Sequence, residues 1–366
     1  MSTKFTAWIL SFLSFFAVWN WSGQPNNIPE TRVYDGAAMA VDKYGVWPTK
    51  EFTQSDARLN WLGAGLLEAA FALKGMIRGG TKTETMLVLH KGKVIYERYA
   101  EGFDENSTKV MYSVTKSVVQ ALLCIAIKEG KIKGVDQKVI EFYPEAKIAP
   151  GQECKRDITI DHLLTMTSGL PGDKDDWDQA WGEWWTAKDT GLAAFMTPQV
   201  NAPGVKHSYS SGPSMQTLAC LISRAVGKDL FSYAKEKLFK PLGMKSVTWE
   251  RAADGRCFGG FGIQMSTRDM ARFGYLYLNY GRWENKQILP VQWVAQSPPK
   301  SMSPRAYGRL FWNLDLAPFG SAYEANGAYG QYIEILPEWD TVIVRTGTQG
   351  PVDVFIRMIG EQLGIS

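Results

Sequence analysis

The sequence predicts an α+β fold, in which an antiparallel sheet flanked by helices is built from both ends of the chain and an all-helical domain is inserted between them. Residues 85–90 and 94–100 are β-type runs joined by a short Lys-Gly-Lys turn, which predicts a hairpin near one end. Residues 330–335 and 341–345 predict a second pair of strands near the other end. Residues 135–250 consist mostly of helical patterns and loops. Because strands lie at both ends and helices between them, the two ends are expected to pair in one sheet.

The composition is that of an ordinary globular protein, since 45% of the 366 residues are hydrophobic and 21% are charged. This excludes a disordered or collagen-like chain, and the length suggests about two domains. The net charge is +3 and no basic run stands out, so no nucleic-acid partner is expected. The chain has only 3 histidines, which disfavours a multi-histidine metal site. We expect no metal and no organic cofactor.

The amino terminus has the pattern of a targeting segment. Lys4 precedes an apolar run over residues 7–19, which predicts a secretory signal within residues 1–23 and an exported protein, periplasmic or secreted. No clean small-residue cleavage site follows this run. An uncleaved anchor, with membrane association through residues 5–22, is therefore the main alternative. A buried amino-terminal helix is a further one.

The remaining chain divides by pattern into three parts. Residues 24–60 are interrupted by prolines and predict an irregular amino-terminal extension. Residues 61–120 and 251–366 are expected to form the α/β domain, and residues 121–250 the helical domain. The active site is expected between these two domains. The oligomeric state stays open.

Four helices are predicted with particular clarity. Residues 61–77 and 352–363 have apolar residues at helical spacing. A Gly-rich segment introduces a further helix over residues 267–280. The helix over residues 112–129 is apolar on every side, with Gln120 the only polar residue in its middle, so it is expected to be buried all round.

Ser113 and Lys116 stand at the start of this buried helix in an S-x-x-K pattern. Residues three apart share a helix face, so the amine would lie one turn from the hydroxyl. A lysine whose charged form is disfavoured by an apolar setting can remove the serine proton and make the hydroxyl a nucleophile. A second S-x-x-K, Ser232 to Lys235, lies on a Lys-rich helix that is predicted to face solvent, and we assign it no chemistry.

Two further segments can contribute to one site. Tyr209 and Ser211 lie two apart before an apolar helix, where a phenol could relay a proton. A buried tyrosine with a serine helix cap is the simpler interpretation of that segment. Gly327 permits close backbone approach, and the N–H of Ala328 could serve an oxyanion hole. A Gly-rich turn is the simpler interpretation here.

Several catalytic motifs are absent from the chain, among them G-x-S-x-G, the P-loop, a dinucleotide-binding G-x-G-x-x-G and HExxH. The 3 histidines lie in no recognisable triad motif. None of the 4 cysteines forms a C-x-x-C pair, and a bridge between Cys154 and Cys257 is left open.

Taken in order, these motifs resemble the serine β-lactamase and penicillin-binding-protein superfamily, and most closely its class C-like esterases and 6-aminohexanoate-dimer hydrolases. The resemblance begins near Met86 and runs to the end of the chain. It rests on the segments Tyr112 to Ser117, Ile158 to Leu170, Tyr209 to Ser211, Gly259 to Gly274 and Gly327 to Gln331. It implies the β-lactamase/transpeptidase-like form of the predicted α+β fold.

The resemblance also implies roles. Ser113 would be the acyl-forming nucleophile, Lys116 its base and Tyr209 the proton relay. Ser211 stands where the second motif has Asn or Ser. The backbone N–H groups of Ser113 and Ala328 would form the oxyanion hole.

One position departs from the pattern of β-lactamases and D-alanyl peptidases. Their third motif begins with Lys or His, and this chain has Ala325 there. That cation helps hold a substrate carboxylate, which an alanine cannot do. Trp177 lies in a Trp- and Asp-rich segment, and the resemblance implies that this segment covers the site, where it could bind an apolar or amine-bearing substrate. Helical core packing is the simpler interpretation of its spacing.

The sequence therefore predicts a serine hydrolase, a carboxylesterase or amidase, that cleaves a small-molecule ester or linear amide through an acyl-enzyme. Penicillin-binding, D-alanyl peptidase or β-lactamase activity is the first alternative. A non-catalytic relative that acts as a binding protein is the second.

Overall fold

Six strands of the computed structural model pair in one antiparallel sheet, in the order β2-β1-β11-β10-β9-β8. The structure describes residues 71, 83–175, 182–298, 307–315 and 321–348, all within the unit that runs from Gly36 to Ser366. The strands are β1 (Thr83–His90), β2 (Lys93–Tyr99), β8 (Trp312–Asp315), β9 (Ser321–Gly327), β10 (Gln331–Leu336) and β11 (Thr341–Gly347).

The register of β1 on β11 joins the two halves of the sequence. Leu87 lies opposite Val344, and Leu89 lies opposite Val342. The alternation of side chains along a strand puts these four residues on one face, where all of them belong to the main apolar core. The predicted fold is confirmed, because strands from both parts of the sequence form one antiparallel sheet.

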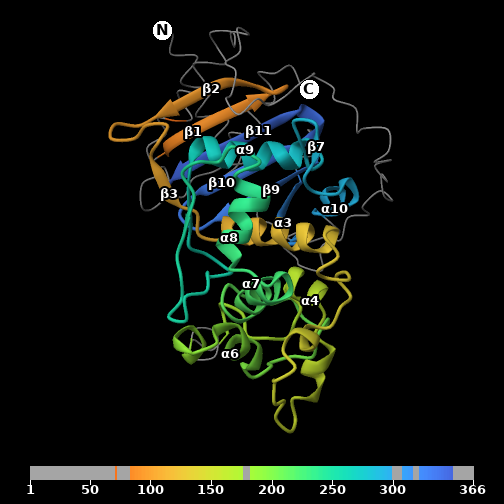
Figure 1. The fold of residues 1–366 in the computed structure, drawn as a ribbon. Coiled ribbons are helices and arrows are strands. Elements are labelled where there is room, and N and C mark those ends of the chain that lie inside the picture. The colour runs from red at the N-terminus through yellow and green to blue at the C-terminus, as the bar shows by residue number, and fades with distance from the viewer. Residues whose placement is uncertain (1–70, 72–82, 176–181, 299–306, 316–320, 349–366) are drawn as a thin grey trace, which may run out of the picture. The chain divides into compact units, whose positions relative to one another are not determined.

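Two helices cover the core face of this sheet (Figure 1). Helix α9 (Thr267–Leu278) packs across β1, β10 and β11. It approaches closely because Gly274 has no side chain, and a Cβ there would lie 2.7 Å from side-chain atoms of Ile333 and Val342. Helix α3 (Val114–Lys128) lies against β9 and β10. Overpacking a core position of this kind costs roughly 1–3 kcal/mol, so Gly274 fixes how near α9 can lie.

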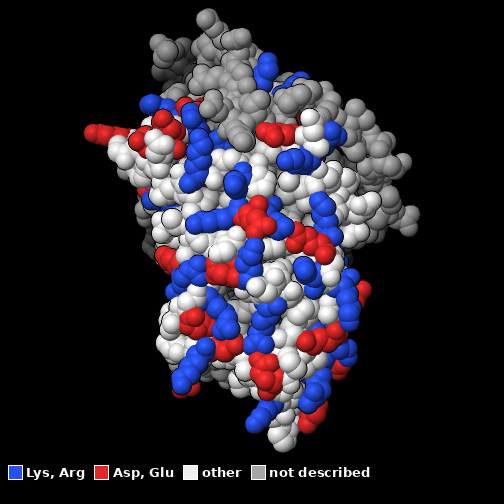
Figure 2. All heavy atoms as spheres, viewed as in Figure 1, with Lys and Arg blue, Asp and Glu red and all other residues white. Residues whose placement is uncertain are grey.

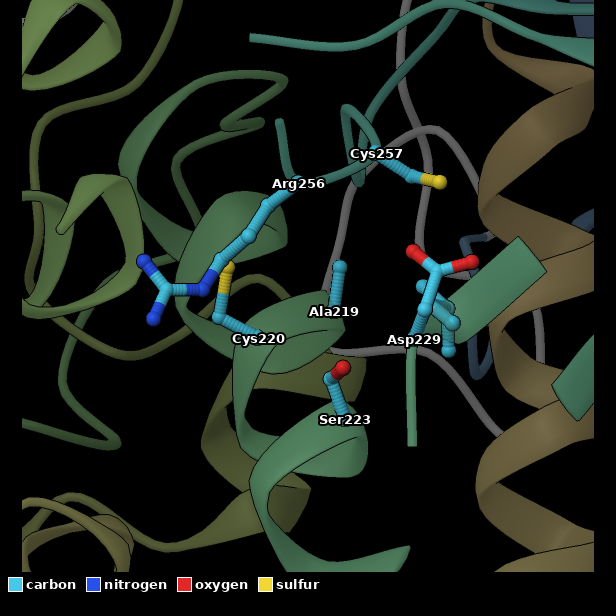
Figure 3. Close-up of a pocket in the computed structure, with 7 residues that line it drawn as sticks. Ala219, Cys220, Ser223, Asp229, Arg256 and Cys257 are labelled. Atoms are coloured by element: carbon cyan, nitrogen blue, oxygen red, sulfur yellow. The ribbon is translucent and has the colours of Figure 1, made fainter. Parts of the chain in front are cut away.

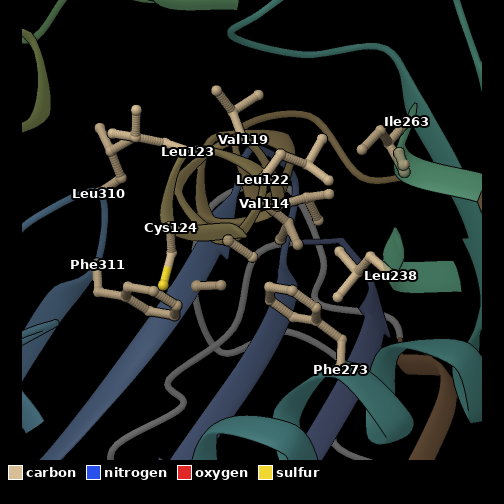
Figure 4. Packing of buried hydrophobic residues seen from close by; sticks show 14 of the residues in the cluster. Val114, Val119, Leu122, Leu123, Cys124, Leu238, Ile263, Phe273, Leu310 and Phe311 are labelled. Atoms are coloured by element: carbon tan, nitrogen blue, oxygen red, sulfur yellow. The ribbon is translucent and has the colours of Figure 1, made fainter. Parts of the chain in front are cut away.

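Helix α3 is buried on nearly every side, as its composition predicts. Its residues from Val114 to Ala126 are all buried. Figure 4 shows its apolar side chains spread among neighbouring elements, with Cys124 beside Phe311 and Phe273 below the helix. A helix without a solvent face must be held by packing from several directions. The first turn of α3 therefore lies in a rigid and largely apolar setting.

Between α3 and β4 (Thr248–Trp249) the described residues form helices and no strand. Helix α7 (Pro213–Val226) packs against α3, α4, α6 and α8. Its first residue is proline and it ends at Gly227, which has a left-handed φ of 64°. The other helical elements are η1 (Val139–Phe142), η2 (Glu153–Asp157), α4 (Ile160–Leu164), η3 (Glu183–Thr186), α6 (Thr190–Met196), α8 (Leu230–Ala234) and η4 (Lys235–Phe239).

A small second sheet brings two distant segments together near the start of α3. It has the order β3-β5-β4, with β3 at Thr108–Val110 and β5 at Ile263–Ser266. The Met111 N–H donates to the carbonyl of Ile263 at 2.7 Å, and the Ile263 N–H donates to the Thr115 hydroxyl at 3.3 Å. The Gly-rich segment before β5 is thereby held beside the first turn of α3. The remaining described elements are β6 (Arg282–Trp283), β7 (Lys286–Gln287), α10 (Val291–Ala295) and η5 (Pro337–Trp339).

Several predictions fall on residues outside the described part of the chain. These are the signal or anchor within residues 1–23, the extension over residues 24–60, the helix over residues 352–363 and, apart from residue 71, the helix over residues 61–77. The domain boundaries stay a prediction. Among the described residues, no helix has the length and apolar character needed to cross a membrane.

Neither charge nor cysteine chemistry points to a further function in the described part. On the face shown in Figure 2, positive and negative side chains are interspersed and neither gathers into a patch. All 4 cysteines are free thiols, so Cys154 and Cys257 are not bridged. No group of acidic, His and Cys side chains that could hold a metal ion is found among the described residues.

Candidate active site

Ser113 is the N-cap of α3, and it follows a tight turn. Tyr112 has a left-handed φ of 46°, which is unusual for a bulky residue and costs backbone energy. Its ring packs against Tyr329, with 5.1 Å between the ring centroids. An N-cap serine commonly accepts a hydrogen bond from its own helix, but the Ser113 side chain makes no such capping bond. Its hydroxyl therefore remains available to a different partner.

That partner is Lys116, one turn along the same helix. The Lys116 Nζ lies 2.7 Å from the Ser113 Oγ, 2.9 Å from the Ser211 Oγ and 2.9 Å from the Gly260 carbonyl oxygen. The lysine side chain is only 1% exposed. Burial lowers the pKa of Lys116 to about 7, against a smaller opposing effect of the negative charge on Asp173. A large share of the amine is therefore neutral near pH 7, as a base for Ser113 needs to be.

The Gly260 carbonyl reaches Lys116 because two consecutive glycines let the backbone pass close to the helical part of the chain. A Cβ on Gly260 would lie 2.0 Å from the Ser211 carbonyl oxygen. A Cβ on Gly259 would lie 2.0 Å from the Met215 carbonyl oxygen. Such distances exclude any side chain at either position without movement of the backbone. Sequence analysis quoted these glycines as a family marker but did not predict that one of them binds the lysine.

The Tyr209 ring lies against the Lys116 amine. Lys116 Nζ lies 4.8 Å from the centroid of the Tyr209 ring. Burial raises the pKa of Tyr209, and a hydrogen bond with Ser113 opposes that rise. The phenol is therefore protonated at neutral pH and can donate a proton. Trp312 stacks on the Tyr209 ring and Tyr307 meets it edge-on, each with 5.6 Å between the ring centroids. These two aromatic neighbours were not predicted from the sequence.

Ser211 joins Lys116 to a carboxylate that sequence analysis missed. The Ser211 Oγ donates to the Asp173 Oδ2 at 2.6 Å, and the Ser211 backbone N–H donates to the Asp173 Oδ1 at 2.6 Å. The Asp173 N–H in turn donates to the Tyr209 carbonyl at 2.7 Å. Asp173 follows the Ser168-Gly169-Leu170 marker by only three residues, but no spacing rule connects it with a serine 38 positions further on.

The third segment lies beside the Ser113 turn. A Cβ on Gly327 would lie 2.2 Å from the Met111 carbonyl oxygen, so the end of β9 touches the chain two residues before Ser113. Ala328 follows at this strand end and is exposed. Ala325 is 1% exposed within the apolar core and brings no charge to the site. Trp177 lies outside the described residues.

A small recess elsewhere contains none of the predicted site residues. It is lined by Cys220, Asp229, Arg256 and Cys257 together with Ala219, Ser223 and Leu230 (Figure 3). Burial raises the pKa of Cys220 and of Cys257 to about 12. Both thiols therefore stay protonated, and neither is activated as a nucleophile.

A family model and several curated proteins match this chain. The family model described as "Beta-lactamase" matches residues 70–356. A 6-aminohexanoate-dimer hydrolase of Paenarthrobacter ureafaciens is 24% identical over 289 residues, which are 72% of this chain and 72% of that protein. The chain spans 34%, 72% and 51% of the length of the first three curated relatives that it matches.

Two solved structures have the same fold. A family VIII carboxylesterase matches with a TM-score of 0.64 at 15% identity, over 86% of this chain and 98% of that chain. EstCE1, described as "a hydrolase with promiscuous acyltransferase activity", matches with a TM-score of 0.65 at 17% identity, over 82% of this chain and 97% of that chain. At these identities the likeness concerns the fold, and it confirms the predicted architecture.

Proposed function

The chain belongs to the beta-lactamase family, and from that premise we propose that it is a serine hydrolase that cleaves an ester or linear amide through an acyl-enzyme on Ser113. The similar proteins reported above are hydrolases, namely a carboxylesterase, a 6-aminohexanoate-dimer hydrolase and a hydrolase with promiscuous acyltransferase activity. The observation that carries the finer proposal is the buried Lys116 Nζ, 2.7 Å from the Ser113 Oγ.

The first half of the reaction forms the acyl-enzyme. The Ser113 Oγ attacks the substrate carbonyl carbon while its proton passes to the Lys116 Nζ. The carbonyl oxygen becomes an oxyanion, which the backbone N–H groups of Ser113 and Ala328 are proposed to bind. Collapse breaks the bond to the leaving group. Tyr209 donates a proton to that group and recovers one from the Lys116 ammonium.

The second half repeats these steps with water. Water attacks the acyl carbon, its proton passes to the amine, and the Ser113 oxygen leaves and regains a hydrogen. The acid product then departs. No metal or organic cofactor takes part in the proposed sequence.

Ala325 favours esters or linear amides over β-lactams and D-alanyl peptides. A positively charged side chain at this position would hold a substrate carboxylate by a charge-assisted hydrogen bond. The buried alanine makes no such contact. Activity on penicillins is therefore the second candidate function, and the match to the beta-lactamase family is the observation that supports it. A purely binding role has less support, because Ser113, Lys116 and Tyr209 are all present and meet in one place.

The test is covalent labelling of the folded protein with a fluorophosphonate probe, measured by intact mass, alongside turnover of p-nitrophenyl esters. Ser113→Ala is expected to abolish both. Ser232→Ala is the matched control, because Ser232 stands in the other S-x-x-K pattern and donates to Asp229 at the exposed end of α8.

The control variant is expected to label and turn over like the wild type. A folded wild type that neither labels nor turns over would favour the binding role. A penicillin adduct on Ser113 that forms within minutes would instead favour the second candidate.

A further inference from the structure

We propose that Asp173 is a positioning residue, which fixes the direction of the Ser211 hydroxyl hydrogen and thereby aims the lone pair of the Lys116 amine at Ser113. The inference rests on the proposed function, since it concerns the base of that reaction. It follows from counting the hydrogens that Asp173, Ser211 and the Gly260 carbonyl can give to the Lys116 amine or receive from it.

Ser211 has one hydroxyl hydrogen, and Asp173 takes it. The carboxylate of Asp173 can only accept hydrogen bonds. One of its oxygens receives the Ser211 backbone N–H and the other lies 2.6 Å from the Ser211 Oγ. The hydroxyl hydrogen therefore points at Asp173. Toward Lys116, 2.9 Å away, the same oxygen can present only a lone pair.

Lys116 consequently faces two neighbours that can only accept. One is the Ser211 Oγ and the other is the Gly260 carbonyl oxygen, each 2.9 Å from Nζ. A neutral amine has two N–H bonds and one lone pair. When both N–H bonds are used on these acceptors, the lone pair is left for the third neighbour, the Ser113 Oγ at 2.7 Å. This is the orientation in which the amine can remove the serine proton.

The substitution Asp173→Asn is expected to reverse this arrangement at nearly constant shape. The Ser211 backbone N–H requires an oxygen, so the amide oxygen takes that place and the amide NH₂ faces the Ser211 Oγ. The Ser211 oxygen then accepts from Asn, and its hydrogen turns toward Lys116. There it donates to the lone pair that should face Ser113.

A simple effect of charge makes a different prediction. Asp173 raises the pKa of Lys116, so removal of its charge alone would lower that pKa. The acid limb of kcat/KM would move to lower pH, and the plateau above it would stay the same. Tyr209, the other titratable group against the amine, is protonated throughout this range. A lower plateau of kcat/KM would therefore indicate positioning, whereas a shifted acid limb with an unchanged plateau would indicate an effect of charge alone.

The experiment measures kcat/KM for a p-nitrophenyl ester against pH in the wild type, Asp173→Asn, Ser211→Ala and the double variant. Asp173→Asn is expected to lower the plateau roughly 100-fold, within the range that general-base catalysis supplies. Ser211→Ala removes the misdirected hydroxyl, so the double variant should recover to within about twofold of Ser211→Ala alone.

Asp175→Asn is the matched control. Asp175 lies in the same loop and binds the Gly172 N–H and the Ser208 hydroxyl, but not Ser211. We expect its plateau to stay within about threefold of the wild type, because the hydrogen bonds of Asp175 run to Gly172 and Ser208 and not to the groups around Lys116. Thermal melts confirm that each variant folds. If Asp173→Asn does not fold, Asp173→Ala replaces it, and its loss of kcat/KM should likewise be recovered when Ser211→Ala is added.

Three results overturn the inference. They are an unchanged plateau in Asp173→Asn, effects of Asp173→Asn and Ser211→Ala that multiply in the double variant, and a loss in Asp175→Asn as large as that in Asp173→Asn. Failure of the proposed function has a separate signature, namely wild-type turnover that survives Ser113→Ala.

Discussion

Two buried lysines in this protein have nearly the same environment by the measures usually applied to catalytic residues. Lys116 and Lys155 are each 1% exposed. Burial lowers the pKa of Lys116 to about 7 and that of Lys155 to about 8. Each also lies near an aromatic ring, Tyr209 in one case and Phe195 in the other.

Their hydrogen-bond partners differ. The Lys155 Nζ donates to the carbonyl oxygens of Phe195 at 3.0 Å and Thr197 at 2.7 Å, at the carboxyl end of helix α6. These are groups that a helix leaves without partners and that favour a positive charge. Lys116 instead has among its partners the Ser113 hydroxyl, which is the proposed nucleophile. A lowered lysine pKa therefore marks burial, and only the neighbouring group distinguishes a base from a helix cap.

The largest expected effect is on activity, and it should separate the two lysines. Lys116→Met should lower kcat/KM for an ester about 1,000-fold, because no base remains to accept the Ser113 proton. Lys155→Met should leave kcat/KM within about twofold. It removes the partner of one buried and one part-buried carbonyl group and should cost about 1–3 kcal/mol of unfolding free energy. Steady-state kinetics and denaturant titration measure the two effects. Comparable loss of activity in both variants would contradict the distinction.

A smaller effect tests the acceptor that holds Lys116. Gly260→Ala should lower kcat/KM roughly 10- to 100-fold, because a Cβ only 2.0 Å from the Ser211 carbonyl oxygen must displace the backbone that binds the amine. Gly134→Ala is the control, since a Cβ there meets nothing within 4 Å. Ester kinetics on both folded variants check the expectation, and equal activity in the two would show that the Gly260 carbonyl is dispensable.

The smallest effect is the pH dependence of kcat/KM, in which only Lys116 should be visible. Lys116 accepts a proton only when neutral, so kcat/KM should be level above a pKa of about 7 and fall about tenfold per pH unit below it. Lys155 has a pKa of about 8, but its protonation should leave no trace in this profile. The profile of Lys155→Met should therefore overlie that of the wild type. A limb that moves in this variant would implicate the second lysine in the reaction.

Sequence analysis could predict the parts of this protein that depend on neighbours along the chain. Short β-type apolar runs in β1 and β11 predicted strands, and strands at both ends predicted one sheet. The three-residue spacing within one helical turn put Lys116 near Ser113 before any tertiary contact was known. Tyr209 and Ser211 were singled out from their position before an apolar helix, the family resemblance implied their roles, and both lie against Lys116.

Only the tertiary structure decided which distant groups complete the cluster. Asp173 reaches Ser211 across 38 positions, and the Gly260 carbonyl reaches Lys116 across 144. No local rule specifies such pairs, because they depend on how close the backbones of packed elements can approach, which at Gly259 and Gly260 is set by the absence of a side chain. The sequence alone predicted the fold class, which the structure confirms, and it supplied the proposed nucleophile Ser113 and its candidate base Lys116. The packing of separate elements brought the Ser211 hydroxyl and the Gly260 carbonyl to the Lys116 amine, since a hydrogen bond forms only where the fold brings its two atoms within reach.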